Sequence, residues 1–272
     1  MKLKGVMHMA WLQVDIFSRC LMRSVPLQAV IPAEKLPADS HGLRTVYLLN
    51  GYTGDCSEWL MHADLSQLAA KYRACFVTVS GENGFYTDHP LSGLRYREFV
   101  GRELPELTRS FLPLSARRED TVLAGESMGG YGALHAGMKY AGTFGSILSL
   151  SPGLVFSLLP TLTDGEGNLM DMRRSMFDAI FGDADSAPGS EYEPAVAARL
   201  DGEKTDIFLS CGRGDTLFGM CAELAQSLKD AGWRVFFDAA DGGHDWAYWP
   251  AALERGLARA FGAPGSMNGG GI

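Results

Sequence analysis

The sequence predicts an α/β fold in which helices flank a mostly parallel sheet of about eight strands. Short apolar runs alternate along the chain with longer segments of helical character, which is typical of a parallel sheet covered on both faces. Several of these runs are continuously apolar, as expected of strands that are buried on both sides. The chain has 272 residues, 46% of them hydrophobic, which is enough for one large core.

Eight runs carry the strand pattern. The first two lie close together in the chain, at residues 11–17 and 26–32, so we expect an antiparallel edge there. The other strands are expected at residues 44–50, 74–79, 121–126, 144–151, 206–212 and 234–239. Helices are expected at residues 64–71, 96–111, 129–140, 218–231 and 246–261. Pro105 lies inside the second of these helices and must either kink it or lie near a first turn.

One long segment, residues 152–205, breaks the alternation. It is too long for a plain connection and contains helical pieces near residues 171–181 and 191–200. Long insertions at the carboxyl ends of strands often cover sites, and residues 153–162 are apolar enough for a lid. We therefore expect one domain at residues 9–262 with a lid insertion at 152–205, an N-terminal extension at 1–8 and a flexible tail at 263–272.

Charge and composition exclude several classes of function. The net charge is −8 and no basic stripe is present, so neither nucleic acid nor an anionic membrane surface is expected as a partner. No apolar run reaches transmembrane length, and the N-terminus lacks the pattern of a signal peptide. The five cysteines form no CxxC pair, which favours reduced thiols in the cytoplasm and argues against a zinc site. We expect no cofactor.

The stretch VLAGESMGGYGAL, residues 122–134, contains the pattern G-x-S-x-G with Ser127 at its centre. An apolar strand precedes the pattern and a helix follows it, and this context identifies a nucleophile elbow. The sharp turn needs small residues on both sides of the serine, which Gly125 and Gly129 provide. A capping serine in a glycine-rich turn is the alternative. We predict that Ser127 is a nucleophile.

A serine nucleophile needs a base and an acid. His244 lies in the loop directly after the last expected strand, where the histidine falls in a Ser…Asp…His chain order. Asp215 follows the preceding strand, in DIFLSCGRGDTLF, and would orient the imidazole. Asp241 and Asp245 are rivals through their proximity to His244. We predict that Ser127, His244 and Asp215 form the catalytic triad.

Acyl transfer also needs donors for the tetrahedral oxyanion. The backbone N–H of Met128, directly after the nucleophile, is the first candidate. The second is expected from the loop after the third strand, in LLNGYTGDCSEW, where we predict the N–H of Tyr52. Gly51 allows the turn in this loop.

The chain resembles the esterase D / tributyrin-esterase family of α/β-hydrolases. That family includes S-formylglutathione hydrolases, acetyl and feruloyl esterases and mycolyltransferases. The similar stretches are AWLQVDIFSRCL, VYLLNGYTGDCSEWL, FYTDHP, RELPELTRSFLP, AGESMGGYGAL, SCGRGDTLF and GGHDWAYW. Ser127, Asp215 and His244 match the family's triad, and Met128 and Tyr52 match its oxyanion positions. Many members carry His-Gly where this chain has Asn50-Gly51.

The resemblance implies an α/β-hydrolase fold and a serine carboxylesterase that cleaves short-chain acyl esters through an acyl-enzyme. Alternatives are an S-formylglutathione hydrolase, a feruloyl or acetylxylan-type esterase, an acyltransferase and a non-catalytic binding protein. The partner is a small-molecule ester, and a homo-oligomer is left open. Three tryptophans, Trp59, Trp246 and Trp249, are candidates for a substrate pocket, or else are ordinary core and rim aromatics.

Overall fold

A mostly parallel sheet forms the centre of the computed structural model, which describes residues 8–34, 36, 40–200 and 202–262. Over these residues the sheet has eight strands in the order β1-β2-β4-β3-β5-β6-β7-β8. They are β1 (Met9–Ser18), β2 (Arg23–Pro32), β3 (Arg44–Leu49), β4 (Ala74–Val79), β5 (Thr121–Glu126), β6 (Ser146–Leu150), β7 (Asp206–Gly212) and β8 (Arg234–Ala240). The predicted eight-stranded α/β architecture is confirmed.

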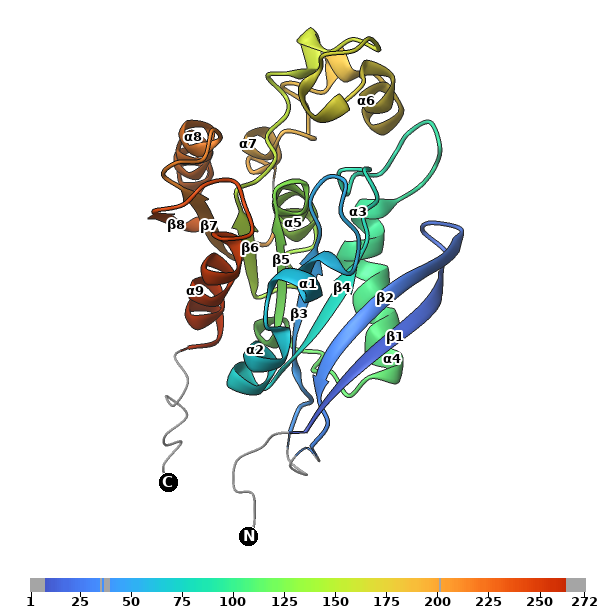
Figure 1. The fold of residues 1–272 in the computed structure, drawn as a ribbon, viewed down its shortest axis with the longest axis vertical. Coiled ribbons are helices and arrows are strands. Elements are labelled where there is room, and N and C mark those ends of the chain that lie inside the picture. Colours follow the sequence, from blue (N-terminus) through green and yellow to red (C-terminus); the bar gives the residue numbers. More distant parts are fainter. Residues whose placement is uncertain (1–7, 35, 37–39, 201, 263–272) are drawn as a thin grey trace.

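The direction of each strand follows from its connection. β1 and β2 form an antiparallel hairpin, and β2 also pairs antiparallel with β4. All pairs from β4 through β8 are parallel. Each connection between parallel strands contains at least one helix, as a crossover requires. The carboxyl ends of the parallel strands therefore lie along one edge of the sheet, the upper edge in Figure 1.

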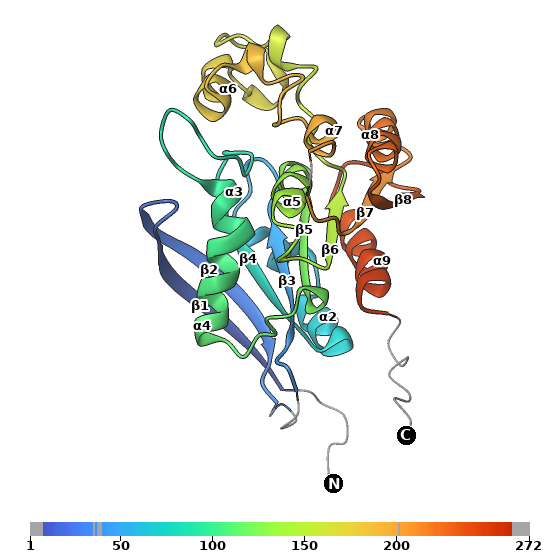
Figure 2. The same ribbon diagram turned by 180° about the vertical axis from the view of Figure 1, so that it is seen from behind.

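Helices cover both faces of the sheet. They are α1 (Glu58–His62), α2 (Leu65–Tyr72), α3 (Tyr96–Glu98), α4 (Leu104–Phe111), α5 (Met128–Lys139), α6 (Arg174–Phe181), α7 (Pro194–Ala197), α8 (Phe218–Asp230) and α9 (Trp249–Phe261). Helices α2 and α9 lie on one face, and α4, α5 and α8 lie on the other (Figures 1 and 2). In β3, Val46 and Leu48 face the first layer while Tyr47 and Leu49 face the second, because side chains alternate along a strand.

The helix expected at residues 96–111 is interrupted. A π-helical turn, η1 (Phe99–Glu103), separates α3 from α4, and Pro105 lies in the first turn of α4. A proline ring clashes with the carbonyl four residues earlier in a regular α-helix. The wider π turn accommodates it at that position. The short helix α1 had no counterpart in the prediction, and the predicted helix at 191–200 reduces to α7.

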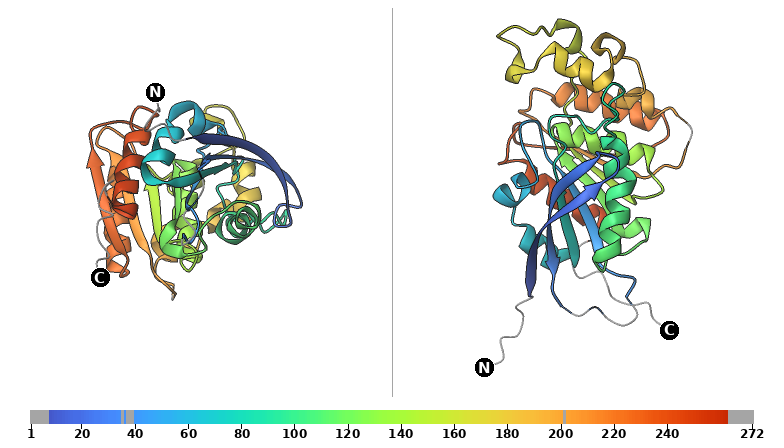
Figure 3. Two further views of the ribbon diagram at one scale, coloured as in Figure 1. Left: turned by 90° about the horizontal axis from the view of Figure 1, so that it is seen from below. Right: turned by 90° about the vertical axis from the view of Figure 1, so that its right-hand side faces the viewer.

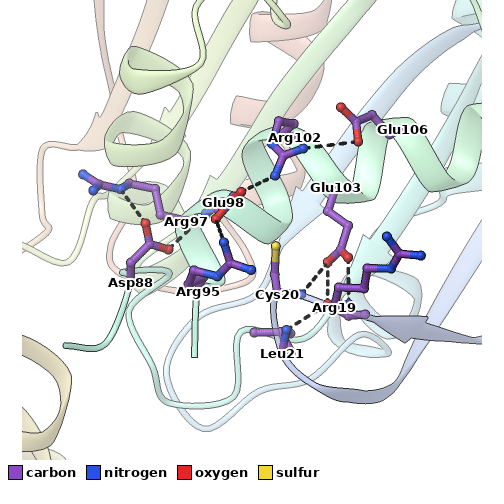
Figure 4. Close-up of polar contacts among 11 residues, drawn as sticks. Arg19, Cys20, Leu21, Asp88, Arg95, Arg97, Glu98, Arg102, Glu103 and Glu106 are labelled. Carbon is purple, nitrogen blue, oxygen red and sulfur yellow. Dashed lines mark hydrogen bonds and ion pairs between the residues drawn. The ribbon is translucent and has the colours of Figure 1, made fainter. Parts of the chain in front are cut away.

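Glu103 fixes the β1–β2 hairpin against η1 (Figure 4). Its carboxylate accepts hydrogen bonds from the Ser18 hydroxyl at 2.5 Å, from Arg19 N–H at 2.7 Å and from Cys20 N–H at 3.2 Å. Burial raises the pKa of Glu103, but these hydrogen bonds outweigh burial and hold the pKa below its ordinary value. The ionised carboxylate therefore ties the hairpin turn to the helical layer.

The segment between β6 and β7 lies above the carboxyl edge of the sheet, as the right-hand view of Figure 3 shows. It carries α6, α7 and short 3₁₀ turns. Phe156 and Leu159 are buried in the same hydrophobic cluster as α5, so the segment is anchored to the core. Within the described ranges, no helix is long and apolar enough to cross a membrane. The expected N-terminal extension, apart from His8, and the expected tail at 263–272 lie outside the described residues.

Candidate active site

Ser127 occupies a strained turn between β5 and α5. Its backbone has φ 52° and ψ −118°, a combination that few residues other than glycine adopt. The turn is held from both sides: Ser127 N–H donates to the carbonyl of Leu150 at 2.9 Å, and its own carbonyl accepts from Gly153 N–H at 2.8 Å. This arrangement presents the hydroxyl at the carboxyl edge of the sheet, where the sequence motif places it.

The two motif glycines are required by close backbone approaches. A Cβ on Gly125 would lie 2.3 Å from the carbonyl oxygen of Gly129, and a Cβ on Gly129 would lie 2.3 Å from the carbonyl oxygen of Leu49. Both distances are far inside van der Waals contact, so any larger residue would push α5 away from β3 and β5. The motif spacing therefore reflects how tightly the helix packs against the sheet.

His244 and Asp215 meet Ser127 at the same edge. His244 Nε2 lies 2.9 Å from Ser127 Oγ, and His244 Nδ1 lies 2.9 Å from Asp215 Oδ2. Asp215 comes from the loop after β7 and His244 from the loop after β8, so the three residues approach one another from three separate loops. The side chain of Asp215 is fully buried, whereas that of His244 is partly exposed. This is the arrangement of a nucleophile, a base and an orienting acid.

Asp215 is held as a carboxylate. Burial raises its pKa, but hydrogen bonds from His244 and from Leu217 N–H outweigh burial and keep the pKa below its ordinary value. Asp241 and Asp245, the two alternatives to Asp215 as the triad acid, make other contacts. Asp241 is 98% exposed and pairs with Arg213, and Asp245 accepts the N–H groups of two residues just before α9.

The predicted oxyanion donors lie directly after Ser127 and in the loop after β3. Met128 is the first residue of α5, so its N–H has no partner within the helix. Tyr52 lies in the loop after β3 and lines the same cavity as Ser127. Among the described residues, the Tyr52 N–H donates to no other group. Neither amide has a hydrogen-bond acceptor among the described residues, as an oxyanion donor requires.

The loop that carries Tyr52 is braced by buried polar groups. The Asn50 side chain donates to the Gly51 carbonyl at 2.7 Å and accepts from Gly81 N–H at 3.1 Å. The hydroxyl of Tyr86 donates to the Asn50 side chain at 2.8 Å. Asn50 thus links this loop to the one after β4.

A cavity of about 330 Å³ opens beside Ser127 and His244. Trp246 and Trp249 line it, and Trp249 stands edge-on to the His244 ring at 5.1 Å. Trp59 does not line it, which corrects the expectation for this residue. Trp59 is 1% exposed, donates its indole N–H to the Leu49 carbonyl and contacts the ring of Trp246 edge-on. It supports the pocket from beneath because α1, which the sequence pattern did not reveal, turns it inward.

Sequence reasoning missed several residues of the cavity, among them Met170 and Glu126. Met170, from the segment between β6 and β7, lines the cavity beside the triad; nothing in its local sequence marks it. Glu126, the residue before the nucleophile, is 2% exposed. Its signal was available, because an acidic residue ends a strand that is otherwise apolar.

The cavity wall carries acidic groups. Glu58, Glu126 and Asp245 line it together with Ser127, and no Lys or Arg is among the described residues that line it. Burial raises the pKa of Glu126 well above its ordinary range; the Gly51 N–H opposes this shift and the charge of Glu58 adds to it. Burial therefore shifts Glu126 toward its neutral form.

Comparison with known proteins gives consistent results. A sequence model of the family described as "Putative esterase" matches residues 18–260. An acetyl esterase of Caldicellulosiruptor saccharolyticus is 35% identical over 251 residues, covering 89% of this chain and 94% of that protein.

Solved structures share the fold. A fluorophosphonate-binding serine hydrolase of Staphylococcus aureus superimposes with a TM-score of 0.81 at 23% identity, over 93% of this chain and 98% of that one. An S-formylglutathione hydrolase of the same organism gives a TM-score of 0.78 at 23% identity, over 93% and 99%. At this level of identity they show the fold, which is that of the α/β-hydrolases.

Proposed function

We propose a substrate class and a mechanism for this chain, which belongs to the putative esterase family and is a serine esterase acting on carboxylic ester bonds. The proposal is that it hydrolyses esters of short acyl groups, of the acetyl or butyryl type. The observation that carries the mechanism is the pair of 2.9 Å contacts from Ser127 to His244 and from His244 to Asp215. A relative that covers most of the chain is named an acetyl esterase, which supports the choice of acyl group.

In the proposed mechanism Ser127 Oγ attacks the ester carbonyl carbon while His244 Nε2 accepts the hydroxyl proton. The resulting oxyanion accepts hydrogen bonds from the N–H groups of Tyr52 and Met128. Protonated His244 then donates its proton to the departing alkoxide, which leaves an acyl-enzyme on Ser127. Water enters, gives its proton to His244 and releases the acid. Asp215 stabilises the imidazolium in both halves of the reaction.

Charge argues against S-formylglutathione as the main substrate. A glutathione moiety is anionic, and the cavity beside Ser127 is lined by acidic groups with no Lys or Arg among its described residues. Bringing an anion into a cavity with a negative wall is unfavourable. We therefore expect neutral esters to be preferred.

The segment at 152–205 is proposed to act as a lid over a single domain. Met170 supports this role because it brings the segment to the cavity wall. Removing residues 153–162 would also remove Phe156 and Leu159 from the core. Point substitutions at the cavity therefore test the lid better than deletions do.

The test is a panel of acetyl, butyryl, feruloyl and acetylated-sugar esters together with S-formylglutathione, measured for the unmodified protein and for Ser127→Ala. We expect acetyl and butyryl esters to give the highest kcat/KM and Ser127→Ala to lower kcat by about 10⁶-fold without changing the unfolding temperature. Retained hydrolysis by Ser127→Ala would refute the mechanism. A clear preference for S-formylglutathione would refute the substrate class.

A further inference from the structure

Glu126 is a buried carboxyl at the centre of the site that the triad mechanism does not use. It is 2% exposed, yet it lines the cavity beside Ser127. Among the described residues, the hydrogen-bond donor that contacts its carboxyl is the N–H of Gly51. Burying a carboxylate without a charged partner costs free energy, so an acidic residue at this position calls for a functional explanation.

The carboxyl of Glu126 fits closely against the loop that carries Tyr52. Its Oε1 accepts the Gly51 N–H. A Cβ added to Gly51 would lie 2.5 Å from Oε2 and 2.7 Å from Oε1 of the same side chain. Gly51 directly precedes Tyr52, so Glu126 holds the peptide plane next to the proposed oxyanion donor. The contact joins the nucleophile strand to the oxyanion loop.

The charges around Glu126 favour its neutral form. Glu58 of α1 lines the same cavity, and its charge raises the pKa of Glu126; the Glu58 carboxyl itself lies 3.7 Å from His62 Nε2. In the loop after β4, burial and the charge of Glu126 raise the pKa of Tyr86. From the loop after β8, His244 and Asp245 line the same cavity. Among the described residues of the cavity wall, His244 alone can carry a positive charge, and Asp215 already pairs with it.

We propose that Glu126 is a positioning residue of the oxyanion loop: its carboxyl fixes the Asn50–Gly51 peptide, which adjoins the peptide that carries the Tyr52 N–H, and a negative charge on Glu126 lowers activity. This inference rests on the proposed function. Once ionised, Glu126 places a negative charge beside the site at which the tetrahedral intermediate develops its own, and like charges oppose each other. Neutral Glu126 gives the same hydrogen bond without that repulsion.

The test compares pH profiles of kcat and KM for a short-chain ester. We expect kcat/KM of the unmodified enzyme to fall at least about tenfold at alkaline pH. Glu126→Gln keeps the acceptor for Gly51 N–H and cannot ionise. Its kcat/KM near neutral pH should stay within about threefold of that of the unmodified enzyme, and it should not fall at alkaline pH. Glu126→Ala removes the acceptor, and its kcat should drop about 10²-fold with little change in KM.

Glu58→Gln is the matched control. It removes a carboxylate from the same cavity wall and leaves the contact between the Glu126 carboxyl and Gly51 N–H in place. Because a like charge raises the pKa of a neighbouring carboxyl, its removal should move the alkaline fall to lower pH. An alkaline fall that persists unchanged in Glu126→Gln, or an unchanged kcat in Glu126→Ala, would overturn the proposal.

An infrared measurement separates this inference from the proposed function. The carbonyl band of a protonated carboxyl should be present at neutral pH, disappear on alkaline titration and be missing in Glu126→Gln, whether or not any ester is cleaved. If no ester is hydrolysed, the proposed function fails while the band still tests Glu126. If Ser127-dependent hydrolysis is found but the band is missing, this inference alone fails.

Discussion

Replacing Asp215 by Asn should disable the base while leaving the fold intact. Asp215 Oδ1 accepts Leu217 N–H at 2.8 Å, and Oδ2 faces His244 Nδ1 at 2.9 Å. An asparagine at this position must keep its carbonyl oxygen toward the Leu217 N–H, so its NH₂ group faces His244 Nδ1. The histidine then has to accept at Nδ1 and carries its proton on Nε2, toward Ser127. In that tautomer it cannot take the serine proton.

The expected loss is large. Holding the wrong tautomer in a serine-protease triad lowers kcat about 10⁴-fold, which corresponds to about 5.5 kcal/mol at 1.36 kcal/mol per factor of ten. We expect a similar loss here because Leu217 N–H and the full burial of the Asp215 side chain fix the orientation of the replacement. The Asp215 charge that stabilises the imidazolium is lost as well.

The assay measures kcat/KM for a short-chain acetyl ester at neutral pH, with thermal unfolding as a check on the fold. Asp241→Asn is the control, since Asp241 is near His244 in sequence but 98% exposed and paired with Arg213; it should retain activity within about twofold. The reasoning is refuted if Asp215→Asn keeps more than a tenth of the kcat/KM, or if Asp241→Asn loses as much.

Three further outcomes are expected. Gly51→Ala should lower kcat about 10²-fold because its Cβ would meet the Glu126 carboxyl, whereas Gly219→Ala, which has open space around its Cβ, should not; steady-state kinetics decide. Met170→Ala should enlarge the cavity and raise the butyryl-to-acetyl ratio of kcat/KM, while Leu169→Ala, on the same exposed turn but absent from the cavity lining, should leave that ratio unchanged. Glu103→Gln should cost about 2 kcal/mol of unfolding free energy near neutral pH. Because the pKa of Glu103 is lowered in the fold, its stabilising effect is present above its ordinary pKa and is lost as pH falls through the lowered value. Urea denaturation at several pH values measures this effect. A difference in unfolding free energy between the variant and the unmodified protein that is the same at every pH would contradict it.

Strand positions and the nucleophile motif were accessible from the sequence because both depend on local pattern. Buried parallel strands are continuous apolar runs, and G-x-S-x-G between a strand and a helix reflects the close approaches at Gly125 and Gly129. The Asp215 and His244 positions also followed from chain order, since the carboxyl ends of parallel strands share one edge of the sheet. Helix ends were less accurate, and α1, only five residues long, gives too short a pattern to recognise.

The sequence by itself determined the α/β-hydrolase architecture and which residues fall at the carboxyl edge of the sheet. Only the tertiary structure decided that Trp246 and Trp249 line the cavity while Trp59 lies beneath it, and that Met170 reaches the cavity from a distant segment. It also decided that Glu126 contacts Gly51, 75 positions earlier in the chain. Periodicity states which face of an element a residue occupies, whereas contacts between distant segments depend on how those elements pack, and no local pattern records that packing.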